Sequence, residues 1–153
     1  MADTRGMRVL RAAGVAFAVH TYDHLEKGAE FAAQALGMPL ERFAKTLVVE
    51  VDDAPVFALM PGDSALSLKK LARAAGAKHA EMADPHTAER LTGYQVGGIS
   101  PFGARRPLPA YLEEALTLYD RIAINGGQRG VILELDPADV IGQLSAVVAD
   151  LSA

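Results

Sequence analysis

The residues best suited to chemistry in this sequence lie in the glycine-rich segment Gly97-Gly98-Ile99-Ser100-Pro101. Two consecutive glycines allow the backbone to approach a ligand closely, and their N–H groups can converge on one oxygen atom. Donors arranged in this way polarise an ester carbonyl as an oxyanion hole does. A purely structural turn would use the same residues, so the segment alone leaves both interpretations open.

Lys45 is the second candidate, because it opens the strongly apolar segment Lys45-Thr46-Leu47-Val48-Val49. A lysine at the mouth of a strand can present its ammonium group to a phosphate or a carbonyl. The alternative interpretation is a charge that marks the point where a buried strand reaches solvent. Position alone favours this second interpretation.

Asn125-Gly126-Gly127 and Tyr22 complete the set of candidates. Asn-Gly is typical of a tight β-hairpin turn, so hairpin geometry alone could explain it, although a binding site could use the same backbone. The Tyr22 hydroxyl could meet a substrate, but a tyrosine at a strand end more often packs its ring and leaves the oxygen in water. Ser100 has no base beside it and is not expected to be a nucleophile.

Several classes of chemistry are missing from the sequence. It contains no cysteine, which excludes disulfides, thiolate metal sites and a cysteine nucleophile. It also lacks a phosphate-binding P-loop, a Gly-x-Ser-x-Gly nucleophile elbow and a His-Glu-x-x-His zinc motif. The four histidines have no recognised metal-ligand spacing; they are His20, His24, His79 and His86. We therefore expect neither a metal nor a cofactor.

Length and composition predict one soluble globular domain over residues 1–153, with 50% apolar and 22% charged residues. No apolar run reaches the roughly 18 residues of a membrane span. The first residues lack the apolar stretch of a signal peptide, so we expect a cytoplasmic protein. The net charge of −4 does not indicate a basic face. Any contact with RNA should therefore be local, or shared with a partner.

The pattern along the chain mixes helices and strands. Helices are expected over 5–13, 29–36, 68–75, 85–91 and 137–144, where capping residues or glycines mark the ends. Hairpins are expected over 45–60 and 121–135, with further strands at 15–22 and 78–82. Residues 108–118 remain ambiguous. Two hairpins exclude a purely parallel sheet, so the prediction is an α/β domain with a mixed sheet that curls into a barrel-like core.

Taken together, the motifs resemble those of the YbaK/EbsC family of trans-editing aminoacyl-tRNA deacylases. They follow one another in order over nearly the whole chain, and Glu-Met-Ala-Asp-Pro with Gly-Gly-Ile-Ser-Pro is the most specific combination. The matching segments are His20-Thr21-Tyr22, Lys45-Thr46-Leu47, Leu68-Lys69-Lys70, Glu81-Met82-Ala83-Asp84-Pro85, Thr92-Gly93-Tyr94, Gly97-Gly98-Ile99-Ser100-Pro101, Gly126-Gly127 and Arg129-Gly130.

The resemblance implies a mostly antiparallel, barrel-like sheet with flanking helices, and it favours a strand within 108–113. It also implies hydrolytic proofreading of mischarged tRNA(Pro), often beside prolyl-tRNA synthetase, with no membrane or DNA partner and by analogy a monomer. Lys45 would orient the terminal adenosine or its ester, and Gly97 to Pro101 would cradle the aminoacyl end. Tyr22 would lie in the pocket, and Asn125, Gly126 and Gly127 would form its rim, where the family often has serine in place of Asn125.

In Cys-tRNA(Pro) deacylases of this family the cysteine thiol of the substrate is thought to attack its own ester. Positioning and electrostatics then matter more than a general base. One position departs from the pattern, because Ile132 stands where an aspartate is expected. Cys-tRNA(Pro) remains the leading substrate, and the Ala-, Ser- and Thr-tRNA esters are the alternatives. A non-catalytic aminoacyl-tRNA-binding module and a hydrolase of another small ester are the competing functions.

Overall fold

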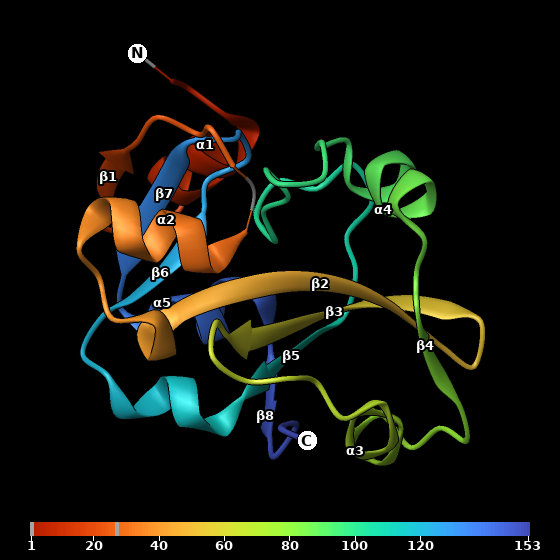
Figure 1. The fold of residues 1–153 in the computed structure, drawn as a ribbon. Coiled ribbons are helices and arrows are strands. Elements are labelled where there is room, and N and C mark those ends of the chain that lie inside the picture. The colour runs from red at the N-terminus through yellow and green to blue at the C-terminus, as the bar shows by residue number, and fades with distance from the viewer. Residues whose placement is uncertain (1, 27) are drawn as a thin grey trace.

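The computed structural model describes residues 2–26 and 28–153. The predicted domain range of 1–153 thus includes Met1 and Lys27, which lie outside the described residues. In this part of the chain one mixed sheet is surrounded by helices (Figure 1). The strands are β1 (Ala18–Thr21), β2 (Phe43–Val51), β3 (Ala54–Pro61), β4 (Ala80–Met82), β5 (Ala110–Glu113), β6 (Ile122–Asn125), β7 (Val131–Leu135) and β8 (Val147–Ala149).

The helices lie where capping residues predicted them. They are α1 (Arg5–Ala12), α2 (Ala29–Leu36), α3 (Leu68–Ala74), α4 (Pro85–Thr92) and α5 (Pro137–Leu144), with 3₁₀ turns η1 (Leu40–Arg42) and η2 (Glu114–Leu118). Ser67 and Asp84 cap α3 and α4 by accepting hydrogen bonds from backbone N–H groups three residues later. Gly37 and Gly93 end α2 and α4 in the left-handed conformation, which costs glycine little.

Both predicted hairpins are confirmed, and they form the frame of the sheet. β2 and β3 pair antiparallel from Ala44 opposite Pro61 to Val51 opposite Ala54, through a turn at Asp52 and Asp53, both of which have positive φ. β6 and β7 pair antiparallel in the same way. The two hairpins meet where β2 runs parallel to β6, so the sheet is mixed, as predicted.

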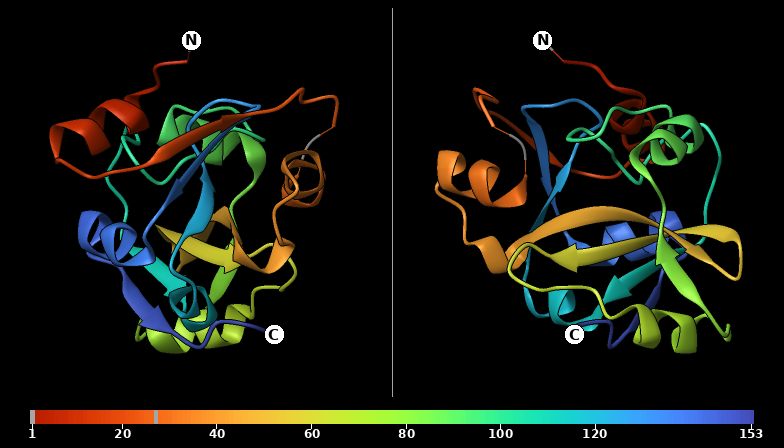
Figure 2. Two further views of the ribbon diagram at one scale, coloured as in Figure 1. Left: turned by 90° about the vertical axis from the view of Figure 1, so that its left-hand side faces the viewer. Right: turned by 45° about the vertical axis from the view of Figure 1, so that its right-hand side comes forward.

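The sheet follows the order β1-β7-β6-β2-β3-β5-β8, and β4 adds to β2 outside this path. It curves around the core, as the two views of Figure 2 show. It is not closed, because β1 and β8 stand at the two ends of the path. The barrel-like prediction therefore holds for the curvature, and the sheet remains open.

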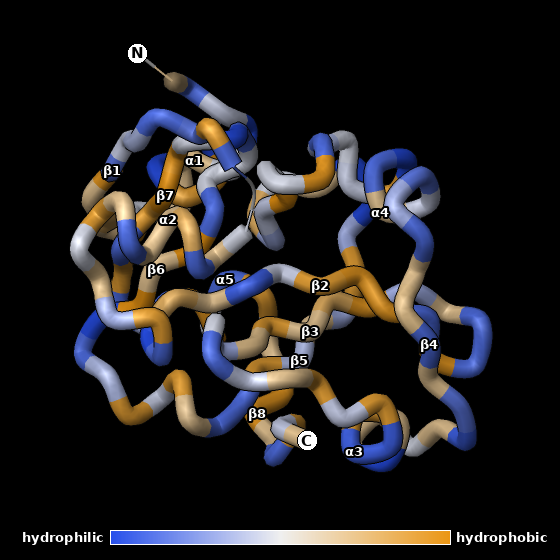
Figure 3. Tube along the Cα trace, in the orientation of Figure 1, coloured by the Kyte–Doolittle hydropathy of each residue, from blue (hydrophilic) through white to orange (hydrophobic). Residues whose placement is uncertain are grey.

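The largest core cluster lies inside this curve, between the sheet and helices α1 and α5. Its members have little or no exposed surface and come from widely separated segments, among them Met7, Leu10, Leu59, Leu112, Ile124, Leu133 and Val140. Figure 3 shows the same contrast along the chain, with hydrophobic stretches on β2 and β3 and hydrophilic residues on the outer turns of α3. Burial of this apolar surface is the main force that holds the sheet in its curved form.

Two segments differ from the sequence prediction, and the structure resolves a third that was ambiguous. The strand expected over 15–22 is shorter and covers only Ala18–Thr21. The ambiguous region 108–118 divides into strand β5 and the 3₁₀ turn η2, in agreement with the strand that the resemblance favoured. β8 was not predicted: it has three residues, and it pairs with β5, which is far away in the sequence.

Candidate functional site

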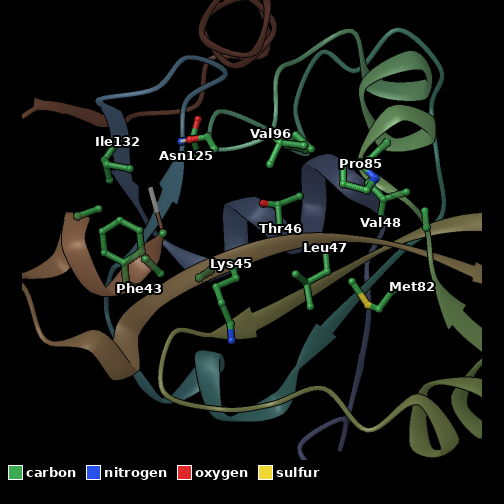
Figure 4. A pocket seen from close by; sticks show the side chains of 18 of the residues that line it. Phe43, Lys45, Thr46, Leu47, Val48, Met82, Pro85, Val96, Asn125 and Ile132 are labelled. Atoms are coloured by element: carbon green, nitrogen blue, oxygen red, sulfur yellow. Dashed lines mark hydrogen bonds between the residues drawn. The ribbon is translucent and has the colours of Figure 1, made fainter. Parts of the chain in front are cut away.

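A cavity of about 300 Å³ lies at a break in the sheet beside β2 (Figure 4). On one edge, β2 pairs with β3 throughout. On the other edge, β6 pairs only with Phe43–Ala44 and β4 only with Val49–Val51. Within residues 2–26 and 28–153, the intervening residues 45–48 thus have no strand partner on this edge. The cavity fills the gap, and the glycine-rich loop lies across from β2.

Five of the predicted site residues line this cavity. They are Tyr22, Lys45, Gly97, Ile99 and Asn125, and they come from four separate segments of the chain, with Gly97 and Ile99 in the same loop. The fold therefore brings together the lysine, the tyrosine, the asparagine and the glycine-rich loop, as a single site requires. The rest of the wall is mostly apolar and includes Ala29, Ala32, Phe43, Val48, Ala88, Val96 and Ile132.

Lys45 is the charged residue among those that line the cavity in the described part of the chain. It is half-buried, and its Nζ donates a hydrogen bond of 2.8 Å to the Ser64 carbonyl oxygen. In Figure 4 its side chain leaves β2 on the side opposite to that of Thr46. The ammonium group is therefore directed away from the side of β2 that Thr46 faces, and it is bonded to the Ser64 carbonyl oxygen.

Tyr22 lies beside α2, where its ring is tilted against that of Phe31, with 6.1 Å between the ring centroids. Burial raises the pKa of the Tyr22 hydroxyl. The phenol is therefore neutral at physiological pH and can both donate and accept a hydrogen bond. This fits a pocket residue that positions a ligand better than one that supplies charge.

Asn125 joins the β6–β7 turn to the glycine-rich loop. Its Nδ2 donates to the Gly97 carbonyl oxygen at 3.0 Å, and its Oδ1 accepts from the Gly127 N–H at 2.8 Å. Arg129 adds a second link, because its Nε donates to the Val96 carbonyl oxygen at 2.9 Å. These three bonds hold both loops at fixed positions around the cavity mouth.

The expectation that Gly97 and Gly98 aim their N–H groups together at one oxygen is wrong for this structure. Gly98 does not line the cavity. Its N–H donates to the Gln95 carbonyl oxygen at 2.8 Å, within the loop itself. Glycine is still required there, since a Cβ would lie 2.8 Å from the backbone nitrogen of Arg129. Gly98 therefore allows close packing of the two loops.

Four more predicted residues also lie behind the cavity wall. Ser100 is completely buried, and its hydroxyl accepts from the Phe102 N–H at 3.1 Å. Pro101 is buried next to it. Gly126 donates its N–H to the Val131 carbonyl oxygen, and Gly127 donates to Asn125. In this structure Ser100, Pro101, Gly126 and Gly127 shape the loops and do not line the cavity.

The N-terminal segment supports both loops, which no sequence motif indicated. The Thr4 hydroxyl donates to the Gly126 carbonyl oxygen, and Arg5 Nη2 donates to the Thr92 carbonyl oxygen at 3.0 Å. The Arg5 guanidinium also lies 5.2 Å from the centre of the Tyr94 ring. Tyr94 in turn donates its hydroxyl to the Phe102 carbonyl oxygen at 2.6 Å. The start of α1 is thus packed against the back of the site.

Ile132 occupies the position where the family resemblance predicted an aspartate. Its side chain is 1% exposed and contributes to the cavity wall from β7. Ala29 and Ala32 of α2 were also missed, and they form part of the same wall. Small apolar residues carry no chemical signature, so only their spacing on one helix face could have pointed to them.

The described residues contain no group of three or more histidine or acidic side chains placed to hold a metal ion. None of the helices in the described part of the chain is both long and apolar enough to cross a membrane.

Comparison with known proteins agrees with this combination of fold and cavity. Residues 25–142 match the model of the aminoacyl-tRNA editing domain. This chain belongs to that family. An Enterococcus faecalis protein named "Putative Cys-tRNA(Pro)/Cys-tRNA(Cys) deacylase EbsC" is 40% identical over 131 residues, which cover 85% of this chain and 79% of the relative.

The names of two further relatives refer to the enzyme that attaches proline to tRNA. A proline–tRNA ligase of Geobacter metallireducens is 39% identical over 77 residues, which make up 50% of this chain and 14% of the ligase. The crystal structure of "a putative trans-editing enzyme for prolyl tRNA synthetase" superimposes with a TM-score of 0.89 at 31% identity. It covers 97% of this chain and 95% of the other.

Proposed function

We propose that this chain is a trans-editing deacylase that hydrolyses the ester between a wrongly attached amino acid and tRNA(Pro), with Cys-tRNA(Pro) as its first substrate. The observation that carries the proposal is the cavity, which gathers Tyr22, Lys45, Gly97, Ile99 and Asn125 at one break in the sheet. The family and the relative with the Cys-tRNA deacylase name support it. The whole of 1–153 would act as one editing domain, in the cytoplasm where translation takes place.

The proposed chemistry relies on the substrate. The cysteine thiol attacks the ester carbonyl, a sulfur–carbon bond forms, and the ester carbon–oxygen bond breaks. The thiol proton passes to the ribose oxygen, which leaves as the free tRNA 3′ end, and the cysteine departs as a thiolactone that water then hydrolyses to free cysteine. Among the described residues that line the cavity there is no carboxylate and no histidine. The site is therefore suited to holding the ester in a reactive geometry.

Lys45 and the loops would provide that geometry. The Lys45 ammonium group would orient the terminal nucleotide or its ester, while the Gly97 and Ile99 side of the loop would cradle the aminoacyl group. Asn125 would hold that loop in place against the β6–β7 hairpin. Tyr22, which is neutral, would donate a hydrogen bond to the bound substrate.

A second set of substrates follows from Ile132. This apolar residue gives the cavity no acid with which to assist a thiol, so Ala-, Ser- and Thr-tRNA are the alternative substrates. The missing acid and base also make a non-catalytic module that binds aminoacyl-tRNA the competing function. Consumption of substrate separates these possibilities.

Prolyl-tRNA synthetase is the proposed protein partner. The chain carries a net charge of −4, so it has little general attraction for the tRNA backbone. A partner that already holds the tRNA would supply most of the affinity. We propose that the chain itself acts as a monomer that contacts the 3′ aminoacyl end and requires neither metal nor cofactor.

The test is a deacylation time course with tRNA(Pro) charged separately with Cys, Ala, Ser or Thr. We expect Cys-tRNA(Pro) to be cleared fastest, with free tRNA appearing at the same rate. Faster loss of Ala, Ser or Thr would assign the specificity to that ester. If none is lost faster than in buffer, the deacylase proposal fails for these substrates, and binding without turnover becomes the leading explanation.

A further inference from the structure

The open edge of β2 leaves the backbone of Thr46 facing the cavity. Along β2, alternate residues turn their N–H and C=O groups to the same edge. The Ala83 N–H donates to the Val48 carbonyl oxygen at 3.1 Å, so Val48 faces the β4 side, and Thr46 must face the same side. The β6 pairing ends at Ala44, and the β4 pairing begins at Val49. Thr46 thus has no strand partner on this edge within residues 2–26 and 28–153.

The side chain of Thr46 also indicates that a ligand binds at this position. Its Oγ1 is a buried side-chain oxygen that has no hydrogen-bond partner in the described part of the chain. Buried polar groups are nearly always paired, and an unpaired one next to a cavity indicates a position that a ligand completes. In Figure 4, Thr46 lies between Asn125 and Val48, below the loop that carries Val96.

The glycine-rich loop does not supply the expected pair of donors, because the Gly98 N–H is already bonded to Gln95. An ester carbonyl in the cavity therefore needs another donor. At a strand edge, each outward-facing residue presents one N–H donor and one C=O acceptor. A ligand pairs with both when it carries a carbonyl oxygen and an ammonium group on two adjacent carbon atoms. An aminoacyl ester has this pair in its carbonyl oxygen and its α-ammonium group.

We infer that the main chain of Thr46 holds the aminoacyl group: its N–H donates to the ester carbonyl oxygen, and its C=O accepts from the α-ammonium group. The substrate would then lie along β2 as a one-residue extension of the sheet, between the ends of β6 and β4. This inference rests on the proposed function for the identity of the ligand. It adds a donor that polarises the reacting carbonyl, and that donor is independent of the side chain at position 46.

The decisive variant replaces Thr46 with its α-hydroxy acid, so that a backbone ester oxygen takes the place of the N–H and the side chain is unchanged. The matched control is the same replacement at Thr21 of β1. Tyr22 donates its N–H to the Gly130 carbonyl oxygen, so the alternation turns the N–H of Thr21 away from β7. Thr46→Val, which keeps the N–H and loses the hydroxyl, separates the main chain from the side chain.

We expect the backbone ester at position 46 to lower kcat/KM by roughly 100-fold, as loss of an oxyanion donor does, while the ester at position 21 leaves it unchanged. Thermal midpoints close to that of the wild type show that all variants are folded. Equal kcat/KM for the two backbone esters would overturn the inference. A loss in Thr46→Val as large as that in the position-46 ester would also overturn it, because the hydroxyl would then be the group that acts.

A binding measurement keeps this test separate from the proposed function. The probe is 3′-amino-3′-deoxyadenosine acylated with cysteine, a stable amide that retains the carbonyl and the α-ammonium group. Calorimetric titration should show at least tenfold weaker binding to the position-46 ester than to the wild type. If the wild type binds the amide but hydrolyses no charged tRNA, the proposed deacylase function is contradicted, while the binding role of Thr46 stands. Equal affinity of both proteins for the amide would refute the role of Thr46.

Discussion

Lys45 is the residue at which charge and position coincide in this site. Lys45 lines the cavity, and its ammonium group is bonded to the Ser64 carbonyl oxygen. We predict that Lys45→Ala lowers kcat/KM for the preferred aminoacyl-tRNA by roughly 100-fold, because the terminal nucleotide or its ester loses its charged contact. The thermal midpoint should fall by only a few degrees, since one half-buried hydrogen bond contributes about 1 kcal/mol.

The matched control for this prediction is Lys78→Ala, which removes an equally charged but exposed residue away from the cavity. Both variants change the net charge by the same amount, so a general electrostatic attraction for tRNA would affect them equally. An equal loss of activity in the two variants would contradict a local role of Lys45.

The site residues that could be predicted from the sequence are those with distinctive chemistry. Lys45, Tyr22 and Asn125 stand out by type, and each lines the cavity. The different roles of Gly97 and Gly98 in the glycine-rich loop could not be predicted, because two neighbouring glycines look alike in a sequence. Only the fold shows that Gly97 faces the cavity while Gly98 is packed against Arg129.

At the scale of the elements, the Asn125 side-chain amide holds the β6–β7 turn and the glycine-rich loop together. We predict that Asn125→Ala costs about 1–2 kcal/mol of stability, because it removes the bonds to Gly97 and Gly127. The loop should then lose its fixed position, and deacylation should fall. Asn125→Ser keeps a short polar group near the Gly127 N–H and should retain more activity than the alanine variant.

Gln95→Ala is the control for this change, because it removes an exposed amide from the same loop. Denaturation midpoints and deacylation rates of the three variants give the comparison. Unchanged activity in Asn125→Ala would show that the loops hold their arrangement without this link, in conflict with the role given to Asn125.

Local signals determine how far the elements could be predicted. The hairpins and helices have strong turn and capping residues, such as Asp52-Asp53 and the Asp84-Pro85 start of α4, and they were predicted to within a few residues. β8 was missed because its three residues form a strand only by pairing with β5. The break beside β2 was also beyond prediction, since it depends on where β6 and β4 stop pairing rather than on any one residue.

At the scale of the whole molecule, one ion cluster links the outer strand of the sheet to the start of β2. Glu134 of β7 accepts from Arg42 at 3.0 Å and contacts His20 of β1 at 2.9 Å. The hydrogen bond from Arg42, followed by that from His20, holds the pKa of the Glu134 carboxyl below its ordinary value of 4.5. The carboxylate therefore stabilises the fold only while it is ionised.

We predict that Glu134→Gln lowers the free energy of unfolding by about 1 kcal/mol at neutral pH. Because the folded-state pKa is the lower one, this contribution is complete above the unfolded-state pKa and disappears as the pH falls through the folded-state value. Urea denaturation from pH 7 down to pH 3 should show the wild-type and variant curves converging. Asp150→Asn, in the more exposed pair with Lys70, is the control that should stay close to the wild type. A gap that is constant over the whole range would contradict this linkage.

The break in the sheet also has a consequence for how such a site can change in size. Its length along β2 is set by how far β6 and β4 extend their pairing, and outward-facing residues recur only every second position, at a spacing of about 6.8 Å. The length of the gap can therefore change only in whole steps. Extending the pairing of β6 or β4 with β2 would cover the next outward-facing residue of β2 completely. Depth and shape, in contrast, vary continuously with the side chains of Ala29, Ala32 and Ile132. Exchange of these wall residues would therefore change which side chain the proposed site accepts, while the frame set by β6 and β4 stays the same.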